Sequence, residues 1–310
     1  MAITAATQTS NFSGFLTPER SAAIFERAAR MSVIQRLARQ VPLGANGQEI
    51  PVVTGRMSAG WVSEAGQKPA SSGSMALKTI TPKKLAAIAV VSAEVVRANP
   101  GNYMNLLREQ IAEAFAIAFD NATAHDAGPD GTAGAGPFST FLDQTTKAVE
   151  LGSTAQASGG VHGDLVAALT LLVNDGKKLT GWALDDRVEP TILGAVDSTG
   201  RPLYVDLPTD ETSQAVARPG RLLNRPSFMG EGLYFNTTAD IYGYAGDWTQ
   251  AAWGVVGGIS YDVSTEATVT INGALTSLWE NNLVAIRAEA EYGWLVNDTA
   301  SFVKLTENVA

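Results

Sequence analysis

The chain has 310 residues, no cysteine and a formal net charge of −9, and 45% of its residues are hydrophobic. The absence of cysteine excludes a disulfide framework, Cys-ligated zinc or iron–sulfur sites and a thiol nucleophile, and the hydrophobic content is too high for a globally disordered chain. The acidic total also argues against a protein that binds nucleic acid over its whole surface.

The charge is unevenly distributed along the chain. Residues 1–85 carry a net charge of +6, whereas residues 86–310 carry −15. Such asymmetry is typical of a basic tail for nucleic acid or a membrane, or of a segment that lies on the acidic body of the same or a neighbouring chain. The longest apolar run, Leu85–Val91, is far shorter than the roughly 20 residues of a membrane-spanning helix. Residues 1–16 show no secretory signal pattern, so we expect the chain to stay in the cytosol of the cell that makes it.

The first third of the chain predicts an arm, a helix and a β-hairpin. Residues 1–16 are small and polar and predict an extended arm. Thr17 and Pro18 then provide an N-cap and a first-turn proline for a helix that ends near Gln40. Two strands are expected at Ile50–Val53 and Lys78–Ile80, joined by residues 56–75, which are rich in Gly, Ser and Ala. A loop this long without a core of its own is usually functional or supported from outside its domain.

The clearest helix is expected at residues 102–125. It follows Leu85–Val96, whose apolar and β-branched residues predict a buried strand ending before a turn at residues 99–101. Apolar residues then recur at helical spacing, as at Leu107, Ile111 and Phe115. About 24 residues at 1.5 Å each give a helix of about 36 Å, long enough to act as a spine.

The remaining residues predict a mixed α+β fold. Helices are expected at 164–173, 187–195 and 275–292. Residues 253–261 and 267–271 are expected to pair as strands. Further strands are expected at 182–184, 201–205, 222–227, 233–236 and 301–305.

Catalytic signatures are scarce. The glycines of residues 131–136 have the wrong spacing for a dinucleotide loop. His125 and His162 lie in polar, loop-like sequence and are candidate bases for a soluble α+β enzyme. The adjacent Asp185 and Asp186 are expected to cap a helix. Two carboxylates, Glu289 and Glu291, are two residues apart on the expected helix and would point to different faces. No cofactor and no metal site is expected.

Six strings in this order and spacing resemble the major capsid proteins of tailed phages with the Hong Kong 97 fold. They are IPVV (50–53), GWVSEAGQKP (60–69), KKLAAIAVVSAEVV (83–96), FDNA (119–122), GDW (246–248) and ENNLVAIRAEAEYG (280–293). The resemblance covers nearly the whole chain and implies a structural protein, not an enzyme.

The resemblance implies a division into four parts. These are an N-terminal arm (1–17), a peripheral domain with the spine helix (18–45, 83–134 and 246–292), an extended E-loop (46–82) and an axial domain (135–245 and 293–310). Copies would form the pentamers and hexamers of an icosahedral head around double-stranded DNA, in a virion assembled in the host cytoplasm. Because the chain starts only a short arm before the first helix, a separate scaffolding protein is expected, with a portal and decoration proteins as further partners. The basic N-terminal part would then contact the acidic bodies of neighbouring copies.

Some members of this family join subunits by an isopeptide bond between a lysine and an asparagine, promoted by a glutamate. The resemblance places these roles at Lys68, Asn282 and Glu289. In shells without such bonds, Lys68 would be a surface ion-pair donor and Glu289 would pair with a nearby arginine. Trp279, Leu283 and Ile286 would supply an apolar setting.

Two rival functions remain open from the sequence. An encapsulin-type nanocompartment shares the fold but packages enzymes, and a soluble enzyme would use His125 or His162. Finding DNA or a cargo enzyme inside purified particles would distinguish a phage head from an encapsulin. Particle size would distinguish either shell from a monomeric or dimeric enzyme.

Overall fold

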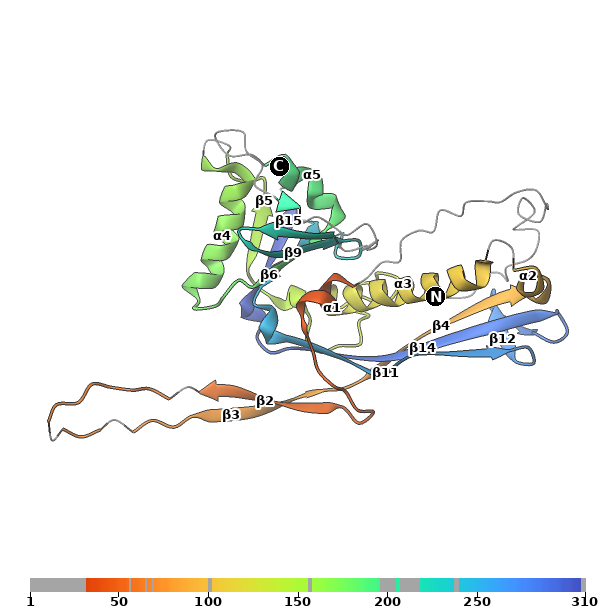
Figure 1. The fold of residues 1–310 in the computed structure, drawn as a ribbon, viewed down its shortest axis with the longest axis horizontal. Coiled ribbons are helices and arrows are strands. Elements are labelled where there is room, and N and C mark those ends of the chain that lie inside the picture. Colours follow the sequence, from red (N-terminus) through yellow and green to blue (C-terminus); the bar gives the residue numbers. More distant parts are fainter. Residues whose placement is uncertain are drawn as a thin grey trace.

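The computed structural model describes residues 32–55, 57–64, 66–68, 70–99, 102–155, 158–195, 205–206, 218–236 and 240–307. The expected arm, most of the expected helix at 17–40 and residues 201–204 of an expected strand lie outside this range. The described part is elongated, with two bodies joined side by side and one hairpin that extends from them (Figure 1).

The first body is a four-stranded sheet covered on one face by a long helix. The strand order is β1 (Arg39–Gln40), β11 (Ala251–Ser264), β14 (Leu283–Val296) and β4 (Lys83–Ser92), and β14 is antiparallel to both of its neighbours. Helix α3 (Tyr103–His125) lies along this sheet (Figure 1). Its apolar stripe packs on alternate residues of β14, which gives a core of Leu107, Ile111, Phe115, Ile286, Ala288 and Ala290. The predicted spine helix is confirmed.

The prediction of a helix at residues 275–292 is wrong. These residues form β13 (Ala274–Ser277), a turn and most of β14. The Ala-, Glu- and Arg-rich sequence favours a helix by propensity, but burial alternates from Arg287 to Ala290 as it does in a strand. Pairing with strands on both sides overrides the local preference, because it satisfies the backbone and buries one face.

The pairing expected between residues 253–261 and 267–271 is also wrong. Strand β11 pairs with β14 and β1, whereas β12 (Thr268–Ile271) forms a small hairpin with β13. The partner of β11 follows in sequence only after this hairpin, so the pairing is not local.

The strand expected at Leu85–Val96 ends earlier, at Ser92. The Ser92 hydroxyl accepts a hydrogen bond from the Val95 amide at 3.3 Å and caps helix α2 (Ala93–Ala98). Helix α2 ends at Ala98, and its C-cap residue Asn99 has a left-handed φ of 37°. Helix α1 (Val33–Leu37) likewise ends before the expected boundary at Gln40.

The second body holds a seven-stranded sheet. Its order is β5 (Ala148–Leu151), β15 (Phe302–Glu307), β10 (Ile241–Gly246), β6 (Gly181–Asp185), β9 (Arg225–Gly230), β8 (Arg218–Leu222) and β7 (Val205–Asp206). Helices α4 (Gly160–Asn174) and α5 (Glu189–Leu193) bury Leu165, Leu172 and Ile192 in one core against it. A short 3-10 helix, η5 (Asp186–Val188), precedes α5.

Most elements predicted for this body are confirmed, including both helices, the strand at 182–184 and the closing strand. The expected strand at 222–227 is wrong, because it is broken by a turn at Leu223 and Asn224, which have positive φ. The expected strand at 233–236 is reduced to one bridge between Phe235 and Ile241. The central strand β10 was not predicted.

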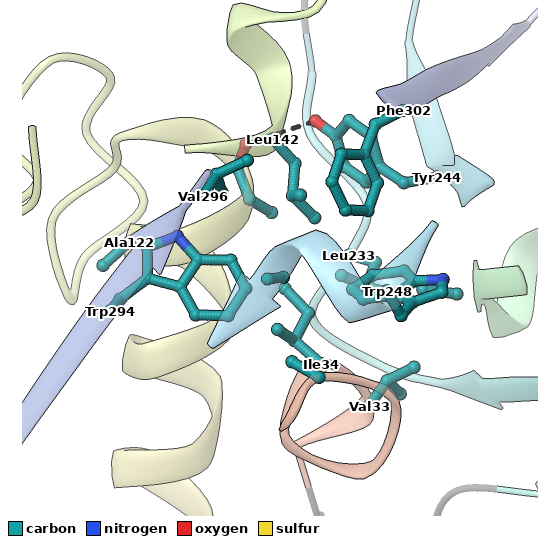
Figure 2. Close-up of a cluster of buried hydrophobic side chains, with 14 of the residues drawn as sticks. Val33, Ile34, Ala122, Leu142, Leu233, Tyr244, Trp248, Trp294, Val296 and Phe302 are labelled. Carbon is teal, nitrogen blue, oxygen red and sulfur yellow. Dashed lines mark hydrogen bonds between the residues drawn. The ribbon is translucent and has the colours of Figure 1, made fainter. Parts of the chain in front are cut away.

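A hydrophobic cluster fixes the two bodies to each other (Figure 2). It gathers side chains from α1, α3, β10, β14 and β15, among them Ile34, Trp294, Tyr244 and Phe302. Because the cluster draws on both sheets, we expect the two bodies to unfold together.

Candidate functional site

The hairpin of β2 (Gln48–Gly55) and β3 (Ser74–Ile80) confirms the two strands predicted for it and extends away from both bodies (Figure 1). Pro51 pairs with Leu77 and Val53 with Met75, so these four side chains share one face. Val53, Met75 and Leu77 are 61%, 67% and 64% exposed. An isolated two-stranded hairpin is marginal in water, and an apolar face on it marks a contact surface.

The base of the hairpin is attached firmly to the first body. Ile80 is fully buried in a cluster with Val41 and Leu43. The Lys78 ammonium donates to the carbonyl oxygen of Asn297 at 2.5 Å. The hairpin therefore leaves the body in a defined direction, while its far end extends into solvent.

Lys68 and Asn282 belong to opposite ends of the molecule. Lys68 is exposed in the loop that joins β2 to β3, and this loop extends from one end (Figure 1). Asn282 follows the β12–β13 hairpin, which lies at the other end (Figure 1). Any bond between these two residues must therefore join different copies of the chain.

Asn282 is held in a defined conformation. It has a left-handed φ of 52°, and its carbonyl oxygen accepts a hydrogen bond from the Ala93 amide at 2.9 Å. Its side-chain Nδ2 donates to the Glu94 carboxylate. The hydrogen bond from its own backbone amide is the largest influence on the Glu94 carboxyl. With smaller contributions from Ser92, Asn282 and the nearby Arg97, it outweighs desolvation and holds the pKa of this carboxyl below its usual range.

Glu289 does not lie beside Asn282. The two are seven positions apart along extended backbone, a distance of roughly 23 Å at about 3.3 Å per residue. The Glu289 carboxylate is instead 3.4 Å from the Lys84 ammonium and 3.6 Å from the Arg287 guanidinium. Because β14 is a strand, Glu289 and Glu291 point to the same face, so the expectation of different faces is wrong.

The expected apolar setting is present only in part. Leu283 is buried with Val90 and Leu278, and Ile286 is buried beneath α3. Trp279 is 77% exposed, and its carbonyl oxygen accepts from the Asn282 amide at 3.4 Å. Trp279 is thus the member of the expected trio that can cover an incoming side chain.

His125 is not in a polar loop. It ends α3, where Nε2 donates to the Leu233 carbonyl oxygen at 3.0 Å and Nδ1 accepts from the Tyr244 hydroxyl at 2.9 Å. The ring also stacks on Phe235. Burial lowers the pKa of His125 to about 4, so the ring is a neutral core group with both nitrogens engaged.

The other candidate residues also have structural settings. His162 lies on α4, not in a loop. Asp185 caps η5 as predicted, since its Oδ1 accepts from the Arg187 amide at 3.1 Å, and its Oδ2 accepts from the Tyr234 amide at 2.9 Å. Among the described residues, no group of three His, Asp or Glu side chains is placed to hold a metal ion. None of the helices in the described part combines the length and apolar character that crossing a bilayer requires.

Glu94 was not predicted as a site residue. The string Ser92-Ala93-Glu94 contains a signal for it, because Ser followed by an early acidic residue is typical of a helix start. The contact with Asn282, 188 residues away, depends on the register that pairs Ser92 with Leu283.

A family model described as "Phage capsid family" matches residues 13–306. The chain is 42% identical over 303 residues to a probable major capsid protein of Mycobacterium phage D29, covering 96% of this chain and 92% of the relative. A protein of the same description from Mycobacterium phage L5 is 44% identical over 312 residues, covering 97% and 92%. A solved structure from Gordonia phage Cozz is similar in fold, with a TM-score of 0.72 and 23% identity over 97% of this chain and 94% of that one.

Proposed function

The chain belongs to the phage capsid family, and from that premise we propose how its copies are joined. It is a major capsid protein with the α+β fold of the Hong Kong 97 type. As a structural subunit of an icosahedral phage capsid it is a virion component and not an enzyme.

Self-assembly into a shell needs contacts between unlike surfaces of neighbouring copies. The observation that best supports such a contact is the exposed apolar face of the β2–β3 hairpin, formed by Pro51, Val53, Met75 and Leu77. This face stands clear of its own body, and burying it on a second copy removes apolar surface from water. The hairpin therefore acts as an E-loop that lies across a neighbouring subunit.

For the division into parts we propose the one that the sequence predicts. Residues 46–82 are the E-loop, residues 18–45, 83–134 and 246–292 the peripheral domain, and residues 135–245 and 293–310 the axial domain, while the arm expected at residues 1–17 lies outside the described residues. Copies form pentamers and hexamers around double-stranded DNA in the host cytoplasm. A separate scaffolding protein, a portal and decoration proteins complete the assembly.

A covalent bond reinforces the contact. Lys68 of one copy and Asn282 of another form an isopeptide bond, consistent with their places at opposite ends of the molecule. Glu289 was expected as the base. Because Glu289 lies far from Asn282 of the same chain along β14, the Glu289 that acts at this bond would have to come from a further copy.

Electron microscopy of the purified full-length chain tests the assembly, and denaturing gel electrophoresis of the particles tests the bond. We expect shells of megadalton size that contain DNA when isolated from virions, and ladders of covalent multimers on the gel. Particles filled with an enzyme instead of DNA would contradict the phage-head function. A clean monomer band near 32.5 kDa would contradict the bond alone.

A further inference from the structure

We propose that Glu94 is a catalytic carboxylate of the Lys68–Asn282 cross-link and acts within the same chain as Asn282. This inference rests on the cross-linking proposed above. Its basis is that the leaving nitrogen of that reaction, Nδ2 of Asn282, donates its hydrogen bond to the Glu94 carboxylate.

The fold itself brings the two side chains together. In the register between β14 and β4, Leu283 pairs with Ser92, so the residue before Leu283 lies beside those after Ser92. Ser92 caps α2 and places Glu94 in the first helical turn, where the helix dipole favours a negative charge. The Ala93 amide holds the Asn282 backbone from the same turn. Two hydrogen bonds between Asn282 and α2, one accepted and one donated by Asn282, thus orient it before any partner arrives.

Glu289 has a different environment. It is engaged by Lys84 and Arg287 on the sheet face, far along β14 from Asn282. Within the part of the chain that the structure describes, Glu94 is the carboxylate in contact with the Asn282 amide. Because Glu94 binds Nδ2 of Asn282, the Oδ1 oxygen of the same amide is not held by Glu94.

The reaction balances with this arrangement. The Lys68 ammonium loses a proton to Glu94, and the neutral amine attacks Cγ of Asn282. The new C–N bond forms, the bond from Cγ to Nδ2 breaks, and the leaving nitrogen takes protons from the attacking amine and from Glu94. Lys-NH₃⁺ and the amide become the isopeptide and NH₄⁺, with no oxidant or cofactor. Docking of the loop over exposed Trp279 would remove water, which favours the neutral lysine and raises the basicity of the carboxylate.

The test compares shells of the wild type, Glu94→Gln and Glu289→Gln on denaturing gels over time. Glutamine keeps an oxygen that can accept the Asn282 hydrogen bond but cannot carry the proton. We expect E94Q shells to cross-link at least about 100-fold more slowly, as for loss of a general base, and Glu94→Asp to restore part of the rate with a shifted pH profile. E94Q ladders at the wild-type rate would overturn the role of Glu94 and leave the cross-link itself standing. Absence of ladders in the wild type would overturn both.

Mixed shells test the same-chain requirement. Co-assembly of Lys68→Arg with E94Q subunits combines an intact Asn282–Glu94 pair with an intact Lys68 on different chains, and we expect cross-links. Co-assembly of Asn282→Ala with E94Q subunits separates Glu94 from every remaining Asn282, and we expect cross-links to form no faster than in E94Q shells. Cross-links at the rate of the first mixture would contradict action in the same chain. This design also serves if E94Q alone forms no shells.

Discussion

Gly254 and Gly293 lie directly opposite each other in β11 and β14, and the Leu43 side chain occupies the space beside both. A Cβ on Gly293 would lie 2.4 Å from Ile80 and 2.7 Å from Leu43, and one on Gly254 would lie 2.8 Å from Leu43. The bare backbone pair is therefore what allows the base of the β2–β3 hairpin to pack closely on the sheet.

We expect Gly293→Ala to destabilise the subunit by about 1–3 kcal/mol, the usual cost of overpacking, and to loosen the hairpin base. Denaturant unfolding of unassembled subunits measures the first effect, and hydrogen exchange in β3 the second. Gly44→Ala is the matched control, because a Cβ there meets only the Gly47 oxygen at 3.9 Å. Equal stability of the two variants would show that the close packing contributes nothing.

A charge on the apolar hairpin face should block assembly without unfolding the subunit. Leu77→Lys changes a side chain that is 64% exposed in the free chain, so its effect on subunit stability should stay within about 0.5 kcal/mol. Buried against a second copy, an unpaired ammonium is costly. Ala76→Lys, on the opposite face of the same strand, is the control. We expect A76K to assemble more completely than L77K by light scattering; the reverse order would assign the contact to the other face.

The buried His125 should make the subunit sensitive to acid. Its pKa is lowered to about 4 by burial, so the unfolded state binds the extra proton between pH 6.5 and 4, and stability falls as the pH falls through this window. The full effect is up to about 3 kcal/mol at 1.36 kcal/mol per unit. Unfolding free energies of the wild type and His125→Gln between pH 4 and 7 measure it, and an equal slope in both would exclude His125 as the source.

Asp120 should make the stability of the subunit depend on pH in the opposite direction. It is fully buried on α3 and accepts hydrogen bonds from the Ser32 hydroxyl and, at 3.1 Å, the Val33 amide. Desolvation outweighs these bonds and raises its pKa to about 7. The folded state therefore binds the extra proton between about pH 4 and 7, and this contribution to stability is lost as the pH rises through that window.

Asp120→Asn should remove this dependence on pH and cost about 1–3 kcal/mol of unfolding free energy. The two carboxylate oxygens of Asp120 accept from Ser32 and Val33, whereas the Asn amide has a single acceptor oxygen. The difference in unfolding free energy between wild type and D120N, measured from pH 4 to 8, isolates the effect. A difference that does not change with pH would show that Asp120 keeps one protonation state throughout.

The sequence by itself determined the mixed fold class, the spine helix, the two strands of the β2–β3 hairpin and the family, because these depend on local periodicity and on strings that keep their order. It also placed Lys68 and Asn282 as cross-linking candidates, and these assignments stay predictions. It could not exclude a helix at 275–292, since Ala, Glu and Arg favour helices and only strand partners distant in sequence reveal β14.

Only the tertiary structure decided which groups share a site. Because β14 is a strand and not the expected helix, Glu289 lies roughly 23 Å from Asn282 along it. The register of β14 with β4 places Glu94 beside Asn282 instead. Burial likewise makes His125 a core residue in place of a candidate base. Register and burial depend on residues more than 100 positions apart, so no local pattern in the sequence contains them.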